Sequence, residues 1–490
     1  MTTGKTIAKN ASWLLMATFA QKFFAFLAFT IAARIVGPHV TGEYFFAVAI
    51  TSTFVVIGDL GLTPVVIRAI AGNEERGRRF MGAALRLKAL LIPIAIMASL
   101  VFGWLRMIET SVMYALLIMV LVMSADAIHL LFYGALRGRQ LLRFEALGMF
   151  FGQLFSAVAA ISAAVLGWGA PGLAFALLCG SVWNLGWSWL CTKRQETWLI
   201  HPKKQDYKDL MWQAVPFALA GIFVKVYSYL DTMVIEAFHG SFAVGNYAVA
   251  YKLTYALQFI PLVFVAALYP AMSAVYARRK KRELQTVFAG SLRLMAIAGA
   301  PIAAGLSAIA PRAIPLLYDI EFLGAVAPLT VLAWVLFPIF LDFPVGSLLN
   351  ATNRAHLKTT AMGFAMLLNA ALNFFFVPIY GPVGAAWAAI ISFSVLTLIG
   401  LVFTRRELPS FFWIFSLIAR SGIVSALIWF GVRYIGHIMP FAFAILFGAA
   451  IGITGLLVLQ LLTISDLRSV FRWLHSRIRP VDPEKEEIHE

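Results

Sequence analysis

Long apolar runs separated by short polar stretches make up almost the whole chain. Each run holds about 19 to 33 residues, and a helix needs roughly 20 to cross a bilayer. Because lipid offers no partner to backbone amides, runs of this length are predicted to be membrane-spanning helices. Fourteen runs occur, at about 12–36, 44–67, 83–105, 112–136, 145–167, 172–191, 213–238, 244–276, 287–310, 326–349, 359–377, 383–403, 411–435 and 441–463.

Composition excludes the other broad classes of protein. The 490 residues are 61% hydrophobic and 13% charged, against about 25% charged in soluble domains, and a disordered chain needs low hydrophobicity. The runs and their short loops leave no room for a soluble catalytic domain. We therefore predict an all-α integral membrane protein with about fourteen transmembrane helices. Twelve is the alternative, if one run lies in the membrane interface.

Basic residues are distributed unevenly between the loops. Of the 39 lysines and arginines, 31 fall on one side, four on the other and four inside the runs. Since basic loops stay in the cytoplasm, we expect an even number of spans with both termini cytoplasmic. This topology accounts for the net charge of +16 without a nucleic-acid partner.

Two segments are repeated along the chain. Residues 37–47 align with 240–250 at an offset of 203, and residues 169–174 align with 381–386 at an offset of 212. Each matched segment joins two spans, so spans 1–6 are predicted to be a copy of spans 7–12 in the same orientation. Parallel repeats of this kind are typical of transporters, whose substrate site lies between the halves.

The predicted organisation is therefore two pseudo-symmetric six-helix lobes with two appended helices. The N-lobe covers residues 1–200 and the C-lobe covers 201–410. Spans 13 and 14 follow at 411–464, and residues 465–490 form a polar cytoplasmic tail.

Two lysines that the repeat relates lie deep inside predicted spans. Lys22 lies about ten residues into span 1, roughly 15 Å deep, and Lys225 occupies the matching place in span 7. Placing an ionisable side chain at mid-bilayer costs about 2.5–3.5 kcal/mol, so each lysine is expected to have a partner or a function. Reflecting each hairpin about its turn brings Lys22 near Asp59 but leaves Lys225 without a carboxylate. Lys225 is thus predicted to meet an anionic ligand, unless it snorkels or is solvated by water.

Three more charges near the outer turns leave alternatives open. Asp231 and Lys252 are equidistant from the turn between spans 7 and 8, which predicts either a structural salt bridge or part of the site. Arg34 closes span 1 on the outer side. It either caps helix carbonyls or guides an anion.

A third group of residues is predicted to act in cation coupling or gating. Asp126 and His129 lie three residues apart in span 4, hence on one helix face. They hold a proton or a small cation, or they form a structural hydrogen bond. Asp342 in span 10 is a lone acid, which suits a gating contact or a cation ligand. Asp59 and Asp231 complete this candidate set.

Catalytic motifs are absent from the sequence. There is no nucleophile–base set, phosphate-binding loop, metalloprotease motif or pair of carboxylates, and the eight histidines lack ligand spacing. Cys179 and Cys191, the two cysteines, have neither metal spacing nor partners. We expect a protein that is not an enzyme and that has no metal site or cofactor, with H⁺ or Na⁺ as candidate coupling ions.

Several motifs stand out at the turns between spans. They are Ala33-Arg34-Ile35-Val36-Gly37-Pro38, Gly42-Glu43-Tyr44, Asp59-Leu60-Gly61-Leu62, Arg68, Leu136-Arg137-Gly138-Arg139 and Leu349-Asn350-Ala351-Thr352-Asn353-Arg354. These motifs resemble the turns of Wzx-type oligosaccharide flippases. That family belongs to the multidrug/oligosaccharidyl-lipid/polysaccharide (MOP) exporter superfamily, which also includes the MATE antiporters.

The resemblance implies a MATE/MOP-like fold whose two lobes enclose a central cavity and move by alternating access. It implies a substrate of undecaprenyl-diphosphate-linked oligosaccharide that crosses a bacterial inner membrane for surface polysaccharide synthesis. It implies that Lys22 and Lys225 meet the diphosphate, with Arg34 and Lys252 behind them. Membrane lipids and the polysaccharide polymerase and assembly machinery are the further partners it implies.

Two alternatives to this function stay open. Flippases for lipid II-type peptidoglycan precursors are siblings that also use fourteen spans, with spans 13 and 14 forming a groove for the lipid tail. Cation-coupled multidrug antiport is the other alternative. It is less favoured, because cationic drugs favour carboxylates over two related lysines.

Overall fold

The computed structural model describes residues 2–194 and 202–462, and the regular elements in these ranges are all helical. The predicted all-α class is therefore confirmed. The elements are α1 (Thr2–Asp59), α2 (Leu62–Gly72), α3 (Glu74–Leu105), α4 (Thr110–Gly138), α5 (Leu142–Val165), α6 (Gly169–Arg194), α7 (Lys204–Ala256), α8 (Phe259–Ala277), α9 (Lys281–Tyr318), η1 (Ile320–Ala325), α10 (Val326–Leu332), η2 (Ala333–Val335), α11 (Leu336–Ala351), α12 (Ala355–Phe403), η3 (Arg405–Glu407), α13 (Phe411–Phe430), η4 (Gly431–Ile435), η5 (Gly436–Ile438) and α14 (Phe441–Val458).

Three of the long helices double back at a glycine. α1 does so at Gly37 (φ 76°), α7 at Gly240 (φ 73°) and α12 at Gly381 (φ 56°). A positive φ of this kind strains a residue that has a side chain, and glycine adopts it freely. Pro38 and Pro382 follow two of these glycines, where the fixed φ of proline suits the start of the next helix.

Contacts across these glycines establish that the two arms of a helix lie side by side. Phe29 and Phe45 are equally far from Gly37, and their ring centroids lie 5.4 Å apart. The hydroxyl of Tyr247 donates to Asp231 across Gly240 at 2.5 Å. The Asn369 amide donates to the Ser392 hydroxyl across Gly381 at 3.1 Å. Each of these helices is thus a hairpin, as the matched turns in the sequence predicted.

The number of membrane crossings follows from the long helices and their hairpins. Within the described ranges, eleven helical stretches are long and apolar enough to cross a membrane. Three of these stretches contain the hairpins at Gly37, Gly240 and Gly381. The structure accommodates the fourteen crossings expected from the sequence, and the count itself stays a prediction.

Two predicted spans have different edges in the structure. The second was expected to run to residue 67, but α1 ends at Asp59 because Leu60 (φ 42°) and Gly61 (φ 73°) adopt left-handed backbone. The short helix α2 follows. The eighth was expected to be continuous over 244–276, and it is interrupted between α7 and α8.

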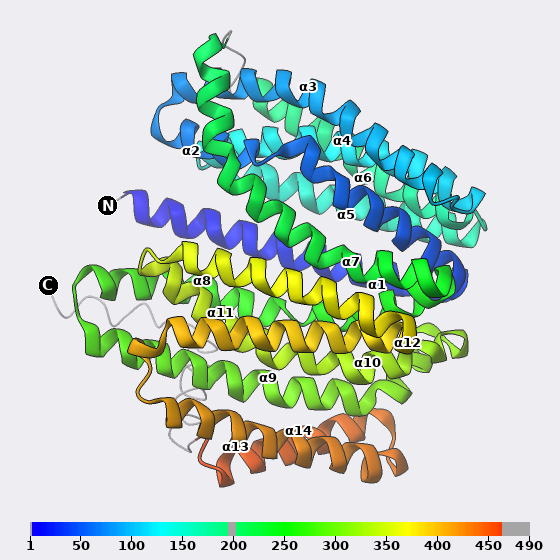
Figure 1. Ribbon diagram of the computed structural model, residues 1–490, viewed down its shortest axis with the longest axis vertical. Helices are drawn as coiled ribbons and strands as arrows, with labels where there is room; N and C mark the ends of the chain where they lie inside the picture. Colours follow the sequence, from blue (N-terminus) through cyan, green and yellow to red (C-terminus); the bar gives the residue numbers. More distant parts are fainter. Residues whose placement is uncertain (1, 195–201, 463–490) are drawn as a thin grey trace, which may run out of the picture.

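The helices form two groups that meet at one end of the molecule. α3 to α6 lie on one side and α8 to α12 on the other, with α1 and α7 between them (Figure 1). The groups meet at the end that holds Gly37 and Gly240, here called the hairpin end. They diverge toward the end where the N-terminus lies, here called the basic end (Figure 1). Such a wedge suits an alternating-access transporter.

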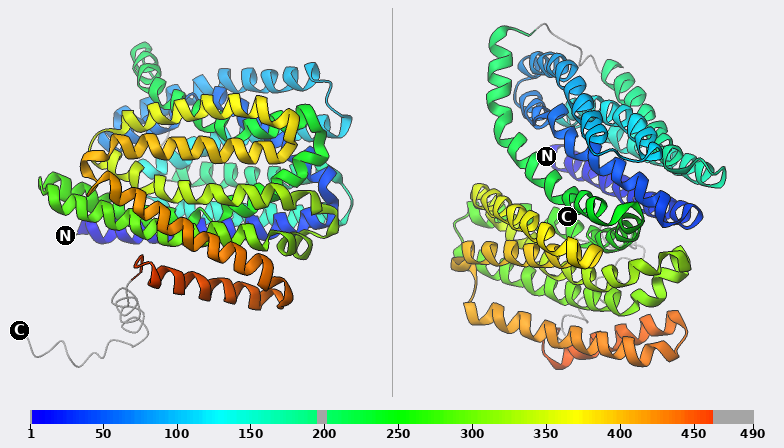
Figure 2. Two further views of the ribbon diagram at one scale, coloured as in Figure 1. Left: turned by 60° about the horizontal axis from the view of Figure 1, so that its bottom comes forward. Right: turned by 45° about the vertical axis from the view of Figure 1, so that its right-hand side comes forward.

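The last two helices pack on the edge of the second group (Figures 1 and 2). Leu417 and Ile428 of α13 share a buried cluster with Leu292 and Ala296 of α9. The domain limits at residues 200, 410 and 464 stay predictions. Residues 195–201 and the predicted tail, 465–490, lie outside the described residues.

Candidate functional site

Two glycines bring the backbones of α1 and α7 into direct contact at the hairpin end. A Cβ on Gly42 would lie 1.7 Å from the carbonyl oxygen of Ser241, and a Cβ on Gly245 would lie 1.9 Å from that of Pro38. No side chain fits at either place. Gly42 and Gly245 are the residues that the internal repeat aligns, so the two halves of the repeat touch at equivalent positions.

Arg34 joins α1 to the second group of helices at the same end. Its Nη1 donates to the carbonyl oxygen of Leu316 in the last turn of α9 at 2.9 Å, and its Nη2 lies 3.6 Å from Asp319. The hydroxyls of Thr30 on α1 and Tyr318 on α9 are 3.1 Å apart near this contact. Of the two roles predicted for Arg34, the structure fits the capping of helix carbonyls, here those of α9. The hairpin end is closed.

A cavity of about 290 Å³, here called the lysine cavity, lies between α1, α5, α6 and α7. Lys252 is the charged residue that lines it. Its Nζ lies 5.5 Å from the ring centroid of Phe29 and 5.3 Å from that of Phe45. Aromatic faces attract a cation but leave its charge available to an anion. Lys22 is exposed and lies near enough for its charge to interact with that of Lys252.

A second cavity of about 350 Å³, toward the basic end, is lined by Lys225 together with Asp59 and Asp126. The Nζ of Lys225 lies 5.6 Å from the ring centroid of Tyr229, which itself lines the lysine cavity. Within 2–194 and 202–462, no ion pair forms to Lys22, Lys225 or Lys252. Lys225 is thus left without a carboxylate partner, as predicted from the absence of an acid at its depth.

The predicted pairing of Lys22 with Asp59 is wrong. Asp59 accepts hydrogen bonds from Lys88 at 2.5 Å and from Thr63 at 2.6 Å. Lys88, on α3, is only 1% exposed, although it is one of the 31 basic residues assigned to the loops on one side of the membrane. Reflection about a turn gives the depth of a residue, but it does not tell which neighbouring helix its side chain faces.

Replacing Lys88 with methionine is expected to destabilise the protein by about 2 kcal/mol. Breaking a buried pair costs about 3–5 kcal/mol, and the partial exposure of Asp59, 34% for its side chain, reduces this cost. Thermal unfolding in detergent, followed by tryptophan fluorescence, measures the effect.

The double variant Lys88→Met with Asp59→Asn removes both charges, so it should recover most of the lost stability. If Lys88→Met melted at the wild-type temperature, the pair would contribute nothing. If the double variant melted no higher than the single one, the loss would come from packing.

Of the alternatives for Asp231 and Lys252, the structural salt bridge is also wrong. Asp231 accepts hydrogen bonds from the Tyr247 hydroxyl at 2.5 Å and from the backbone N–H of Thr232 at 2.7 Å. The two residues have similar depth, but they line different cavities. The acid is satisfied by neutral donors, and the lysine is left for another partner.

Asp126 and His129 lie on one face of α4, as their spacing predicted. Nε2 of His129 is 3.0 Å from Oδ1 of Asp126, and the Ser181 hydroxyl donates to the same oxygen at 2.6 Å. Both residues line a further cavity of about 260 Å³ with Arg137 and Glu145. The hydrogen bond is established, and a role in ion coupling stays a prediction.

Asp342 is not the lone acid expected from the sequence. Lys358 in the first turns of α12 donates to Oδ2 of Asp342 at 2.5 Å. The lysine follows a turn after α11, so the sequence grouped it with the loop residues. An ion pair between α11 and α12 replaces the expected free carboxylate.

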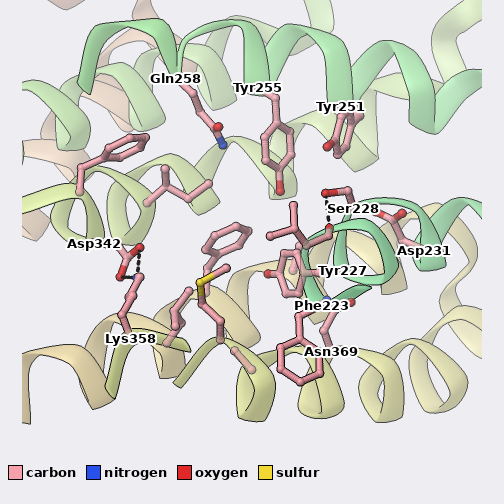
Figure 3. Close-up of a pocket in the computed structure, with 18 residues that line it drawn as sticks. Phe223, Tyr227, Ser228, Asp231, Tyr251, Tyr255, Gln258, Asp342, Lys358 and Asn369 are labelled. Atoms are coloured by element: carbon pink, nitrogen blue, oxygen red, sulfur yellow. Dashed lines mark hydrogen bonds and ion pairs between the residues drawn. The ribbon is translucent and has the colours of Figure 1, made fainter. Parts of the chain in front are cut away.

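A cavity of about 290 Å³ between α7, α11 and α12, here called the aromatic cavity, was not predicted. Figure 3 shows Tyr255 from the second arm of α7 and Gln258 from the break between α7 and α8. They face Phe223 and Tyr227 from the first arm of α7, with the Asp342–Lys358 pair at one side. Tyr251 lines it as well. A tyrosine at every fourth position, 247, 251 and 255, was the sequence signal for this wall.

One further group was hidden from the sequence because its third member lies on a separate element. Ligand atoms of His39, Glu43 and Glu109 lie within 4.8 Å of one another at the hairpin end, a grouping that could hold a metal ion. Glu43 also accepts a hydrogen bond from Ser111 at 2.9 Å. Glu109 comes from the turn before α4, far from the other two in sequence.

Comparison with known proteins gives matches over most of the chain. A model of the family described as "Polysaccharide biosynthesis protein" matches residues 7–276, and the MatE family model matches residues 216–375. The "Probable low-salt glycan biosynthesis flippase Agl15" of Haloferax volcanii is 24% identical over 437 residues, which cover 87% of this chain and 89% of that relative.

Solved structures match the fold. The lipid II flippase MurJ in an inward closed conformation has a TM-score of 0.74 at 16% identity, over 95% of this chain and 99% of MurJ. An inward-facing multidrug resistance MATE transporter of the MOP superfamily has a TM-score of 0.67 at 17% identity, over 81% of this chain and 95% of that one. The predicted MATE/MOP-like fold is confirmed.

Proposed function

Because the chain belongs to the polysaccharide biosynthesis protein family, within the MOP superfamily, we propose that it flips an oligosaccharide linked through a diphosphate to a polyprenyl lipid. It is a multi-pass membrane transporter and not an enzyme, and its family supports a lipid-linked glycan as cargo. The finer proposal is an undecaprenyl-diphosphate-linked repeat unit that crosses a bacterial inner membrane for surface polysaccharide synthesis. The basic end and both termini face the cytoplasm.

The lysines between the two groups of helices carry this proposal. Within the described ranges, Lys22, Lys225 and Lys252 have no carboxylate partner, and two of them line cavities beside α1 and α7. A diphosphate carries charge that a low-dielectric path rejects, and these ammonium groups supply the compensating charge. A lysine ammonium is compact and strongly hydrated, so it can release the phosphate again.

The closed hairpin end supports transport by alternating access. Gly42 and Gly245 hold α1 against α7 there, and Arg34 holds α1 against α9, while the helices diverge toward the basic end (Figure 1). The substrate would enter from the basic end and leave after the hairpin end has opened.

Two alternatives remain in view. A lipid II-type precursor carries the same diphosphate, and the fold resembles that of a lipid II flippase. Cation-coupled drug antiport is disfavoured, because Asp59 and Asp342 are already paired with lysines. For ion coupling by H⁺ or Na⁺, the candidate is the hydrogen-bonded pair of Asp126 and His129.

Depletion of the protein in its native host tests the proposed function. Mass spectrometry of extracted polyprenyl-diphosphate lipids should reveal an accumulated oligosaccharide intermediate, together with a loss of surface glycan. Accumulation of lipid II with normal surface glycan would instead support the peptidoglycan alternative. Unchanged lipid intermediates combined with drug sensitivity would support antiport.

Replacing Lys225 with methionine is expected to abolish most export of the glycan in that host. The substitution keeps the length of the side chain and removes the charge that faces the second cavity. Surface glycan is the measurement, with membrane levels of the protein checked by immunoblot. Lys281→Met, at the exposed start of α9, is the matched control and should export normally. Normal export by Lys225→Met would remove this lysine from the mechanism.

A further inference from the structure

The lysine cavity and the aromatic cavity adjoin at one residue. Tyr251 lines both of them, and Lys252 is the next residue on α7. The two cavities therefore lie on either side of the second arm of α7. A ligand with two chemically different parts could place one part in each.

Among the described residues that line it, the aromatic cavity has no free charge, unlike the lysine cavity. Its charged lining residues are Asp231, Asp342 and Lys358. Asp342 and Lys358 pair with each other, and both oxygens of Asp231 accept hydrogen bonds. Because burying an uncompensated charge is costly, this cavity suits an uncharged ligand.

Its walls combine flat aromatic faces with polar groups. Tyr251 and Tyr255 stack with ring centroids 4.1 Å apart and planes inclined by 23°. Tyr227 is held below them by a hydrogen bond of 3.1 Å between its hydroxyl and that of Ser392 (Figure 3). Stacked faces give an apolar surface with a polar edge, which is the surface that a sugar ring contacts.

Polar groups in the same wall are available to a ligand. Within the described ranges, the hydroxyls of Tyr251 and Tyr255 and the side-chain amide of Gln258 form no hydrogen bond. Figure 3 shows Tyr255 and Gln258 directed into the cavity. Each of these groups both donates and accepts, as do the hydroxyls of a sugar.

We propose that the aromatic cavity is a glycan subsite, in which Tyr255 stacks on a sugar ring while Lys252 binds the diphosphate on the other side of α7. This inference rests on the proposed function and assigns the two parts of the headgroup to two cavities. Gln258, whose amide is directed into the aromatic cavity, would then select the sugar.

Binding of two probes to the purified full-length protein tests this assignment. Undecaprenyl diphosphate carries the phosphate part alone. Undecaprenyl diphosphate linked to glucose, galactose or N-acetylglucosamine adds one sugar. Wild-type protein in detergent should bind at least one sugar-bearing probe more tightly than the bare diphosphate.

Tyr255→Leu should remove this sugar-dependent gain, a loss of about 3- to 10-fold, and leave binding of undecaprenyl diphosphate unchanged. Tyr255→Phe keeps the ring and should keep most of the gain. Phe374→Leu, a matched loss of an aromatic ring at an exposed position of α12, should behave as wild type. Unchanged binding of the bare diphosphate also establishes that the variants are folded.

The outcomes separate the two proposals. If wild-type protein bound undecaprenyl diphosphate but gained nothing from any sugar, the glycan subsite would be overturned and the proposed function would stand. The subsite would also fall if Tyr255→Leu weakened both kinds of probe equally or neither of them. A wild-type protein that bound no polyprenyl diphosphate at all would contradict the proposed function itself.

Discussion

Replacing Lys252 with methionine is expected to lower export of the lipid-linked glycan about 10- to 100-fold, because a charge-assisted hydrogen bond contributes about 1.5–3 kcal/mol. Lys252 is the charged residue that lines the lysine cavity. Methionine keeps an apolar stem of similar length against Phe29 and Phe45, so the cavity should keep its shape. The diphosphate then meets a desolvated site with one positive charge fewer.

Two further variants separate charge from shape at this position. Lys252→Arg restores the charge and should recover part of the export, with slower release because a guanidinium binds phosphate in a bidentate manner. Lys281→Met removes a lysine at the exposed start of α9 and should export as wild type. Surface glycan and the pool of lipid-linked intermediates are the two measurements.

Two results would contradict the role expected for Lys252. Wild-type export by Lys252→Met would exclude the lysine cavity from the transport path. If Lys252→Arg were as inactive as Lys252→Met, the requirement would be for the shape of lysine and not for its charge, and the diphosphate assignment would lose its main support.

The elements of this fold that the sequence predicted are those that depend on one physical constraint. Backbone groups in lipid must be satisfied within the helix, so apolar runs predict spans whatever surrounds them. The turns at Gly37 and Gly240 were also predictable, because a matched glycine appears at both places. The repeat even indicated that Gly42 and Gly245 are equivalent, although it did not indicate that they touch.

The ion pairs could not be predicted in the same way. Depth follows from counting residues along a helix, but a partner is chosen by the rotation of the helix and by the neighbour it faces. Asp59 therefore pairs with Lys88 on α3 and not with Lys22 on its own hairpin. Asp342 pairs with Lys358 because the two side chains face each other from neighbouring helices, which counting residues does not show. The lack of a carboxylate partner for Lys225 was predictable because no acid lies at its depth, and depth does not depend on the rotation of a helix.

Replacing Gly245 with alanine is expected to prevent the hairpin end from closing and to lower export about 10-fold or more. A Cβ there would lie 1.9 Å from the carbonyl oxygen of Pro38 and 3.1 Å from the backbone nitrogen of Gly42. The two backbones would have to separate by roughly 1.5–2 Å to reach van der Waals distance. Overpacking of this kind costs about 1–3 kcal/mol, which shifts a two-state equilibrium about 5- to 150-fold.

Spin labels across the hairpin end measure this shift directly. Trp168, in the turn before α6, and Leu323 of η1 are both more than half exposed and belong to different groups of helices. Labelled as cysteines in a background without Cys179 and Cys191, they should give a longer mean distance in Gly245→Ala than in the parent.

A second glycine provides the control, and a third provides the symmetry test. Gly305→Ala adds the same methyl group in α9, where a Cβ would meet nothing within 4 Å, so its distances and export should match the parent. Gly42→Ala should reproduce Gly245→Ala, since its Cβ would meet the backbone of Ser241 from the other half of the repeat.

If Gly245→Ala left the label distances unchanged, the close backbone contact would not be what holds the hairpin end closed. Closure would then depend on Arg34 and its contacts with Leu316 and Asp319, which are side-chain contacts that the repeat does not duplicate.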